Sequence, residues 1–256
     1  MSFYRNRSRT LWFVTVEVVL RLDEKRHRLP RARWAGEAWG FEFADPRSSL
    51  AGFVRLAVYP TQGVAWFWAA VVGDGRAYVL CRDVELAPPG DPDVLELRGV
   101  SLWTHAICET PLAHWTVAME AFAVAFDDPL EAWRSERGDR IGLAFDLEWE
   151  CVPSDVTSTA ADEGVHRYDA PCTVNGELLV GDESWTIATV GARHHEWGAL
   201  DWSGPTAATG RRGDGEVVWS APLLIDRPDG PARLLRTLRR GASGLVWSEE
   251  IVGGTP

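Results

Sequence analysis

The amino-acid sequence predicts an all-β protein. Its 256 residues include 24 Gly, 15 Pro and 14 Trp together with many Val, Leu and Thr, which is typical of strands joined by tight turns. Long stretches with apolar residues at the helical spacing i, i+3, i+4 and i+7 are scarce. Short apolar or alternating runs recur instead, and turn residues bound them, as in an antiparallel barrel or sandwich.

The predicted strands follow one another along the chain. In the first, residues 15–22, Glu17 interrupts the apolar run and no cleavage pattern of small residues follows, so we expect a strand rather than a signal peptide. The later expected strands are residues 52–59, 64–72, 77–80, 94–97, 115–126, 141–149, 172–180, 185–190, 216–224 and 244–251. Gly-, Pro- and Asp-rich turns separate them, for example residues 60–63, 73–75 and 88–92.

Two local signals refine this pattern. Asn175-Gly176 lies between two apolar runs, and both residues tolerate the positive φ of a type I′ turn, so the pair predicts a hairpin. Residues 231–240 fit a helix that begins at Pro231, with leucines on one side and basic residues on the other, and they fit a strand almost as well.

The expected domain boundary is residues 153–164. This segment is polar, rich in small residues and without an apolar period, so it predicts a linker. It would separate an N-terminal β domain, residues 1–152, from a C-terminal β domain, residues 165–256.

Charge, cysteine content and missing motifs exclude several function classes. The net charge of −11 disfavours binding to nucleic acid, although the first 34 residues hold nine Lys and Arg against three acids. No span reaches the roughly 18 apolar residues of a membrane helix. The four cysteines are too widely spaced for a metal or redox motif, so we expect reduced thiols in a cytoplasmic protein. Phosphate-loop, dinucleotide-binding and serine-hydrolase motifs are absent, so we expect no cofactor.

The segment 190–202 gathers the strongest chemical signal. If it is a strand, Arg193, His195 and Trp197 point to one face, while His194 and Glu196 point to the other. An imidazole would then share a face with a fixed cation and an aromatic wall, which favours its neutral, basic form. Strand ends also carry such residues for packing alone, so a structural role is the alternative.

We expect no metal at this segment. The run His194-His195-Glu196 has the composition of a ligand cluster, but adjacent strand residues point in opposite directions. At most His194 and Glu196 share a side, and two ligands are too few for a metal site.

Residues 168–182, 191–198 and Asp201-Trp202 together resemble the hydroxyneurosporene synthase (carotenoid hydratase) superfamily, which includes lipocalin-like hydratases and pericyclic cyclases. The motif G-x-R-x-H-x-W-G-x-R-D-W is kept except that Leu200 stands in place of the Arg before Asp201. Residues 40–43, 52–59, 64–69 and 104–112 resemble actinobacterial members of unassigned activity. The resemblance covers residues 40–202 and is more specific for membership than for the reaction.

The resemblance implies two lipocalin-like β-barrel or sandwich domains packed side by side, and cofactor-independent acid-base chemistry on a hydrophobic substrate. Asp201 would donate a proton to a carbon-carbon double bond, His195 would be its partner or activate water, and Arg193 would set both pKa values. Trp197 and Trp202 would stabilise the resulting carbocation. Leu200 weakens this assignment, since one charge of the motif is missing.

The expected substrate is a hydrophobic small molecule such as an isoprenoid, a steroid or a polyketide, because aromatic side chains would line the pocket. The candidate substrate-binding residues are Trp66, Trp68, His105, Glu109, Trp197 and Trp202. The alternative function is a non-catalytic lipocalin-like carrier, in which Arg193, His195 and Asp201 hold the domains together. The sequence carries no signal for an oligomeric state.

Overall fold

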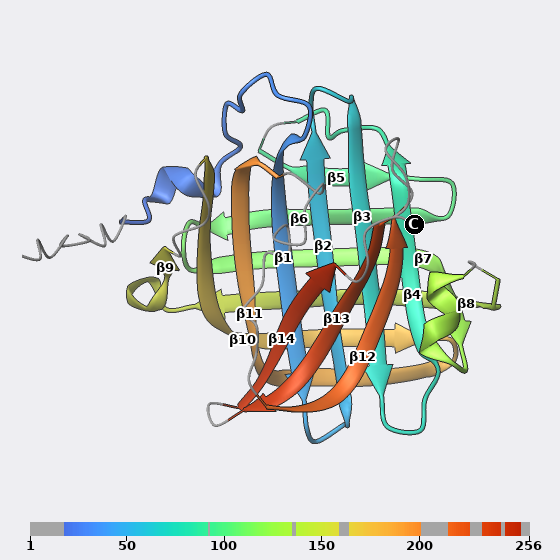
Figure 1. Cartoon of the computed structure of the whole chain (residues 1–256). Helices are drawn as coiled ribbons and strands as arrows, with labels where there is room; N and C mark the ends of the chain where they lie inside the picture. The colour runs from blue at the N-terminus through green and yellow to red at the C-terminus, as the bar shows by residue number, and fades with distance from the viewer. Residues whose placement is uncertain are drawn as a thin grey trace, which may run out of the picture.

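The structure is a computed structural model that describes residues 18–91, 93–134, 137–158, 164–200, 215–225, 232–241 and 244–251. Within these ranges the chain forms antiparallel strands and three short 3-10 helices, η1 (Arg21–Glu24), η2 (Pro129–Trp133) and η3 (Pro153–Asp155). The predicted all-β class is confirmed (Figure 1). None of the helices in the described ranges has the length and apolar character needed to cross a membrane.

The strands form two sheets. Their bounds are β1 (Ala35–Asp45), β2 (Leu50–Tyr59), β3 (Val64–Gly73), β4 (Tyr78–Leu86), β5 (Leu95–Arg98), β6 (Leu102–Thr110), β7 (His114–Phe126), β8 (Asp139–Cys151), β9 (Thr157–Ser158), β10 (Val165–Val180), β11 (Glu183–Ala199), β12 (Glu216–Ile225), β13 (Ala232–Gly241) and β14 (Gly244–Ile251). The large sheet runs in the order β4-β3-β2-β1-β11-β10-β8-β7-β6-β5, and β9 pairs with β10. Because β4 also pairs with β7, this sheet closes on itself. The small sheet has the order β12-β13-β14.

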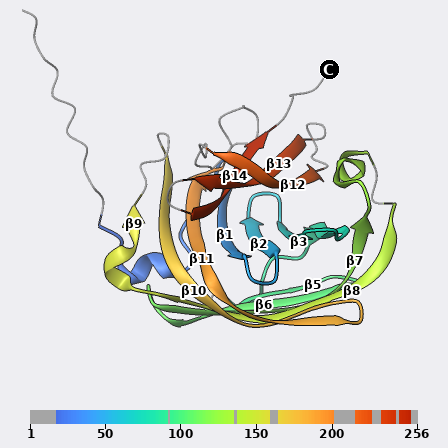
Figure 2. The same ribbon diagram turned by 90° about the horizontal axis from the view of Figure 1, so that it is seen from below.

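The long strands β10 and β11 connect the two layers of the large sheet (Figure 2). The first half of β10 pairs with the end of β11, which in turn pairs with β1, while its second half pairs with β8. Strands β1 to β4 therefore lie over β5 to β8. The small sheet covers the other face of β1 to β3, so the molecule has three layers (Figures 1 and 2).

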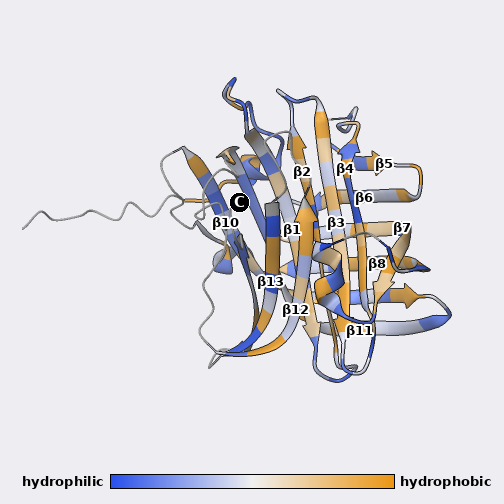
Figure 3. Ribbon diagram, turned by 45° about the vertical axis from the view of Figure 1, so that its right-hand side comes forward, coloured by the Kyte–Doolittle hydropathy of each residue, from blue (hydrophilic) through white to orange (hydrophobic). Residues whose placement is uncertain are grey.

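Two apolar clusters fill the spaces between the layers. The barrel core lies inside the large sheet and includes Leu56, Phe67 and Trp149. The outer core lies between β1 to β4 and the small sheet and includes Phe53 and Trp68. Successive residues of β2 and β3 alternate between these cores, so both faces of each strand are buried. This burial explains the continuous apolar runs in β2 and β3. In Figure 3, where hydrophobic residues are orange, such stretches follow β3 and β12.

Local turn and helix signals were only partly correct. Asn175 and Gly176 lie inside β10, paired with both β8 and β11, so the predicted hairpin at this pair is wrong. The turn lies five residues later, at Gly181, whose φ is 60°. Gly176 is needed because a Cβ there would lie 2.0 Å from the Asp146 carbonyl oxygen. For residues 231–240 both a helix and a strand were expected as alternatives. The structure has the strand β13 at residues 232–241.

The N-terminal expectation is also corrected. Residues 21–24 form the helix η1 instead of the end of a strand, and residues 15–17 lie outside the described ranges. Strands β1 and β6 were not among the predicted strands, although residues 40–43 of β1 and most of residues 104–112, which overlap β6, carry part of the family resemblance. In the expected linker, η3 and β9 are formed, and the division into two domains stays a prediction.

Two of the four cysteines are not reduced thiols. Cys151 in β8 and Cys172 in β10 form a disulfide, whereas Cys81 and Cys108 are free. The sheet register places the two disulfide residues directly opposite each other, with their Cα atoms 4.3 Å apart. Their separation of 21 residues in the chain gives no sign of this contact.

Candidate functional site

The side chains of β11 alternate between the two cores. Arg193 and His195 point into the barrel, where the ring of His195 stacks on Trp39 of the barrel core with ring centroids 4.7 Å apart. Glu196 points to the opposite face and forms an ion pair of 2.5 Å with Arg55. The two faces predicted from the sequence are therefore confirmed, and they lead to two different environments.

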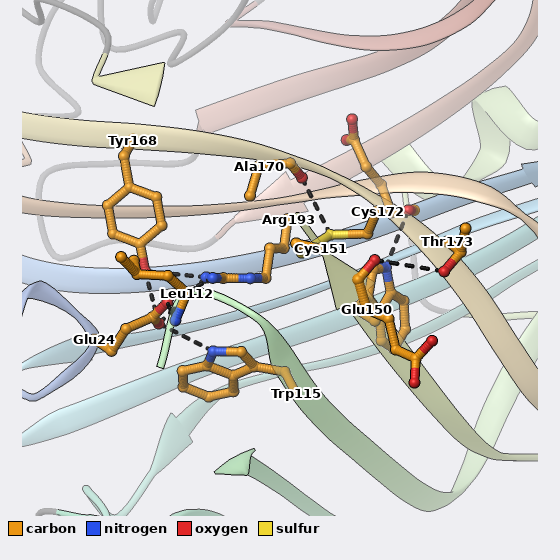
Figure 4. Close-up of a disulfide and its surroundings, with 12 residues drawn as sticks. Glu24, Leu112, Trp115, Glu150, Cys151, Tyr168, Ala170, Cys172, Thr173 and Arg193 are labelled. Carbon is orange, nitrogen blue, oxygen red and sulfur yellow. Dashed lines mark hydrogen bonds and ion pairs between the residues drawn. A yellow bond between two sulfur atoms is a disulfide. The ribbon is translucent and has the colours of Figure 1, made fainter. Parts of the chain in front are cut away.

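On the barrel face, the carboxylate of Glu24 connects η1 to strands β7, β10 and β11 (Figure 4). The Glu24 oxygens accept hydrogen bonds from the Leu112 backbone N–H at 2.8 Å, the Trp115 indole at 3.0 Å and the Tyr168 hydroxyl at 2.8 Å. Arg193 donates to both oxygens. Burial lowers the pKa of Arg193, but the charges of Tyr168 and Glu24 outweigh burial and raise it above its ordinary value.

A second buried cluster lies beside the first. The Nε2 atom of His195 is 2.9 Å from Glu37 Oε1, and its Nδ1 atom is 2.7 Å from the Asp23 carbonyl oxygen. The Nδ1 atom of His27 is 2.8 Å from the same Glu37 oxygen. Burial raises the pKa of Glu37, but the hydrogen bonds from His195 and His27 outweigh it and hold this pKa below its usual value. Arg193 and His195 thus both contact the N-terminal segment.

The opposite face of β11 borders a cleft of about 1160 Å³ between the large and the small sheet. Strands β1, β2, β10 and β11 supply one wall, and β13 and β14 supply the other. Its apolar lining includes Phe43, Pro171, Val190, Leu245 and Trp247. A cavity of this size between two sheets can hold a drug-sized molecule.

Charged pairs line the same cleft. Arg236 of β13 lies 2.9 Å from Glu42 of β1 and therefore links the two walls. Arg167 lies 2.8 Å from Asp169 within β10. Burial lowers the pKa of Arg167, but the charge of Asp169 outweighs it and raises this pKa above its ordinary value. The cleft therefore combines apolar surface with fixed, paired charges.

His194 supplies the imidazole of the cleft lining. It pairs with Gly40 across β11 and β1, and a Cβ at Gly40 would lie 2.0 Å from His194 Nε2. The missing side chain at Gly40 therefore makes room for the ring. An imidazole is the side chain best suited to carry a proton near neutral pH. From the sequence, His194 was expected on the face of the strand opposite to Arg193, and it was given no catalytic role. The alternation along residues 190–199 was the signal that could have identified it.

The other sequence-predicted site residues that lie in the described ranges do not meet in one place. Trp66 and Trp68 are buried in the outer core, where Arg55 lies 5.4 Å over the ring of Trp68. His105 and Glu109 lie on β6, in the layer away from the cleft, and are not among its lining residues.

Trp197 packs between two imidazoles, with its ring centroid 3.8 Å from that of His27 and 5.4 Å from that of His166. Asp201 and Trp202 lie outside the described ranges. The catalytic roles expected for Asp201, His195 and Arg193 stay predictions.

The sequence matches one family model over residues 21–218, and its description is a domain of unknown function, DUF7064. The chain belongs to the DUF7064 family. The matched range includes η1, all strands of the large sheet and the beginning of β12. No curated protein sequence matches this DUF7064 protein.

Solved structures show a distant likeness to this DUF7064 protein. Kievitone hydratase from Nectria haematococca is 13% identical with a TM-score of 0.40, and the match covers 96% of this chain and 81% of that one. CghA with Sch210972 is 10% identical with a TM-score of 0.40, and the match covers 86% of this chain. The chain spans 58% of the length of CghA.

Proposed function

We propose that this DUF7064 protein binds a hydrophobic small molecule in the cleft between the two sheets and acts on it as a cofactor-independent hydratase or cyclase. The observation that carries the proposal is the cleft of about 1160 Å³ with an imidazole, paired charges and apolar surface in its walls. The resemblance of residues 168–202 to the carotenoid hydratase superfamily supports the reaction class.

The lining indicates the substrate class. Pro171, Leu245 and Trp247 offer apolar and aromatic contact to a carbon skeleton of the isoprenoid, steroid or polyketide kind. The buried ion pairs offer hydrogen-bond partners to a hydroxyl, carbonyl or carboxylate group, which would fix the orientation of that skeleton. The expected substrate is therefore largely apolar with at least one polar group.

His194 is the residue to which we assign proton transfer. Its imidazolium would donate a proton to one carbon of a double bond, and Glu42 and Asp169 would stabilise the positive charge on the other carbon. Water then adds to that carbon and its proton returns to His194, so the sum is the addition of one water molecule. In a cyclase, a second double bond would attack instead of water, and loss of a proton to His194 would complete the step.

The same assignment leaves the barrel face with a different task. Arg193 and His195 hold Glu24 and Glu37 at short distance and do not line the cleft. Asp201 lies outside the described ranges, and its expected role as proton donor is the alternative to the assignment of His194.

The test begins with native mass spectrometry of freshly purified protein and identification of any small molecule that copurifies. Ala192→Trp would fill the cleft, because Ala192 is a small lining residue in the wall that β11 supplies. Ala188→Trp is the matched control at an exposed position of the same strand, outside the lining. We expect a hydrophobic compound on the parent and on the control and its loss from Ala192→Trp. Equal retention by Ala192→Trp would contradict binding in the cleft.

Catalysis is tested with the compound so identified and its close analogues. We expect the parent to convert it with a mass gain of one water, or to an isomer of equal mass, and His194→Gln to bind it without conversion. A parent that binds the compound and returns it unchanged would favour the second candidate function, a carrier. The observation on the side of the carrier is that Arg193 and His195 serve the contact with the N-terminal segment.

A further inference from the structure

Three potential metal ligands converge inside the barrel, away from the cleft. Nδ1 of His27, Oε1 of Glu37 and Nε2 of His195 lie within 4.8 Å of one another. They come from the N-terminal segment, β1 and β11, and positions 37 and 195 are 158 residues apart. The expectation that no metal binds concerned only the run His194-His195-Glu196. The set of His27, Glu37 and His195 was not predicted.

The hydrogen bond of His195 to Asp23 leaves its Nε2 atom directed at Glu37. The Asp23 carbonyl oxygen can only accept, so Nδ1 of His195, 2.7 Å away, carries the hydrogen. In the neutral ring, Nε2 then has a lone pair that points at a Glu37 carboxylate oxygen only 2.9 Å away. Two lone pairs at that distance repel each other. A metal ion between the two atoms would accept both lone pairs and remove the repulsion.

Asp23 orients both imidazoles for metal binding. Its carbonyl oxygen accepts from Nδ1 of His195, and its carboxylate lies 3.7 Å from Nε2 of His27. Each ring therefore turns its other nitrogen toward Glu37. A histidine that ligates a metal almost always donates its second ring N–H to a carbonyl or carboxylate, as His195 does to the Asp23 carbonyl oxygen.

Aromatic contacts fix the two rings in place. Trp197 stacks on His27 with an interplanar angle of 5°, and Trp39 stacks on His195 with an angle of 17°. The side chains of Glu37 and His195 are 2% and 1% exposed, so neither has room to rotate away. The three ligand atoms are therefore held close to one point.

We propose that His27, Glu37 and His195 bind one divalent transition-metal ion of the Zn²⁺ class. Two imidazoles and one carboxylate are a common ligand set for Zn²⁺ and Fe²⁺, with the remaining positions open to water. Around a tetrahedral ion these atoms would lie about 3.3 Å apart, so the separations of 2.8 and 2.9 Å need to widen by only a few tenths of an ångström. The His27 side chain is 20% exposed and gives access from solvent.

The ion would fasten the N-terminal segment to the barrel. His27 belongs to the segment that also carries Glu24, whereas Glu37 and His195 belong to paired strands of the sheet. Binding of an ion to the folded state alone stabilises that state. This proposal is independent of the function proposed for the cleft, because none of the three ligands lines it.

The experiment uses the full chain without a histidine tag, stripped with a chelator and titrated with Zn²⁺ and with Co²⁺ as a spectroscopic probe. The test variant is His27→Gln, because His27 is the most exposed ligand and its loss leaves the sheet intact. The control variant is His114→Gln, in the partly exposed group His114, Glu148 and Glu150, which is a second place where an ion could bind.

We expect the parent and His114→Gln to bind one Zn²⁺ each, to gain thermal stability with it and to show the visible bands of imidazole-bound Co²⁺. In His27→Gln the affinity should fall at least about tenfold and the thermal gain should vanish. If the parent binds Zn²⁺ no more tightly than His27→Gln does, or if only His114→Gln loses the ion, the proposal is wrong.

Discussion

The carboxylate of Glu24 and the guanidinium of Arg193 form a buried ion pair between residues that are 169 positions apart (Figure 4). Both side chains are almost fully excluded from solvent, at 1% and 2% exposure. The pair therefore docks the N-terminal segment into the barrel. Arg193, which was expected to set the pKa values of catalytic residues, has Glu24 as a structural partner.

Removal of the Glu24 charge should destabilise the whole chain. Glu24→Gln leaves the buried Arg193 guanidinium without its carboxylate, so we expect a loss of about 3 to 5 kcal/mol in the free energy of unfolding. Urea denaturation measures this loss. In the control variant Asp93→Asn, the lost pair with Lys25 is exposed, and the change should stay below about 1 kcal/mol. Equal effects of the two variants would show that the Glu24 pair is not buried in solution.

A methyl group at position 40 should displace His194. Gly40→Ala places a Cβ 2.0 Å from the His194 ring, so the ring must turn away, and we expect weaker binding of the copurifying compound and slower turnover. Gly142→Ala on β8 is the matched control, because nothing lies within 4 Å of the added Cβ. Binding assays on both variants test this. Unchanged binding by Gly40→Ala would remove His194 from the ligand site.

The disulfide should contribute measurably to stability. Cys151 and Cys172 close a loop with a sequence separation of 21, for which the chain-entropy model gives about 3 kcal/mol. Thermal unfolding with and without a reductant should show a lower melting temperature in the reductant, and the intact mass should rise by two hydrogens. The double variant Cys151→Ala with Cys172→Ala should melt low in both conditions. If complete reduction leaves the melting temperature of the parent unchanged, this expectation is wrong.

The free thiols should resist alkylation near neutral pH. Burial, followed by the negative charge of Glu24, raises the pKa of Cys108 to about 12, and burial raises that of Cys81 to about 12 as well. The reactive thiolate is therefore scarce at pH 8, and its amount should rise about tenfold for each pH unit below 12. Mass spectrometry after iodoacetamide treatment between pH 7 and pH 9 measures the rate. Modification as fast as in the unfolded chain would show that these thiols are accessible and acidic.

The sequence predicted the strands best where long apolar runs coincided with strong burial. The apolar runs over residues 52–59 and 64–72 became β2 and β3, because both faces of these strands are buried. The two faces of β11 were also predictable, since alternation is a property of any extended chain. The turn at Asn175-Gly176 failed because pairing with β8 and β11 on both sides outweighed the local turn preference.

By itself the sequence determined the fold class, most strands and the opposite orientation of Arg193 and His194, because these follow from the chemistry of neighbouring residues. The tertiary structure alone decided what each face meets. Glu24 and Glu37 reach Arg193 and His195, a cleft forms on the side of His194, and Cys151 meets Cys172. These partners depend on sheet register and on contacts between residues up to 204 positions apart, which no local pattern encodes.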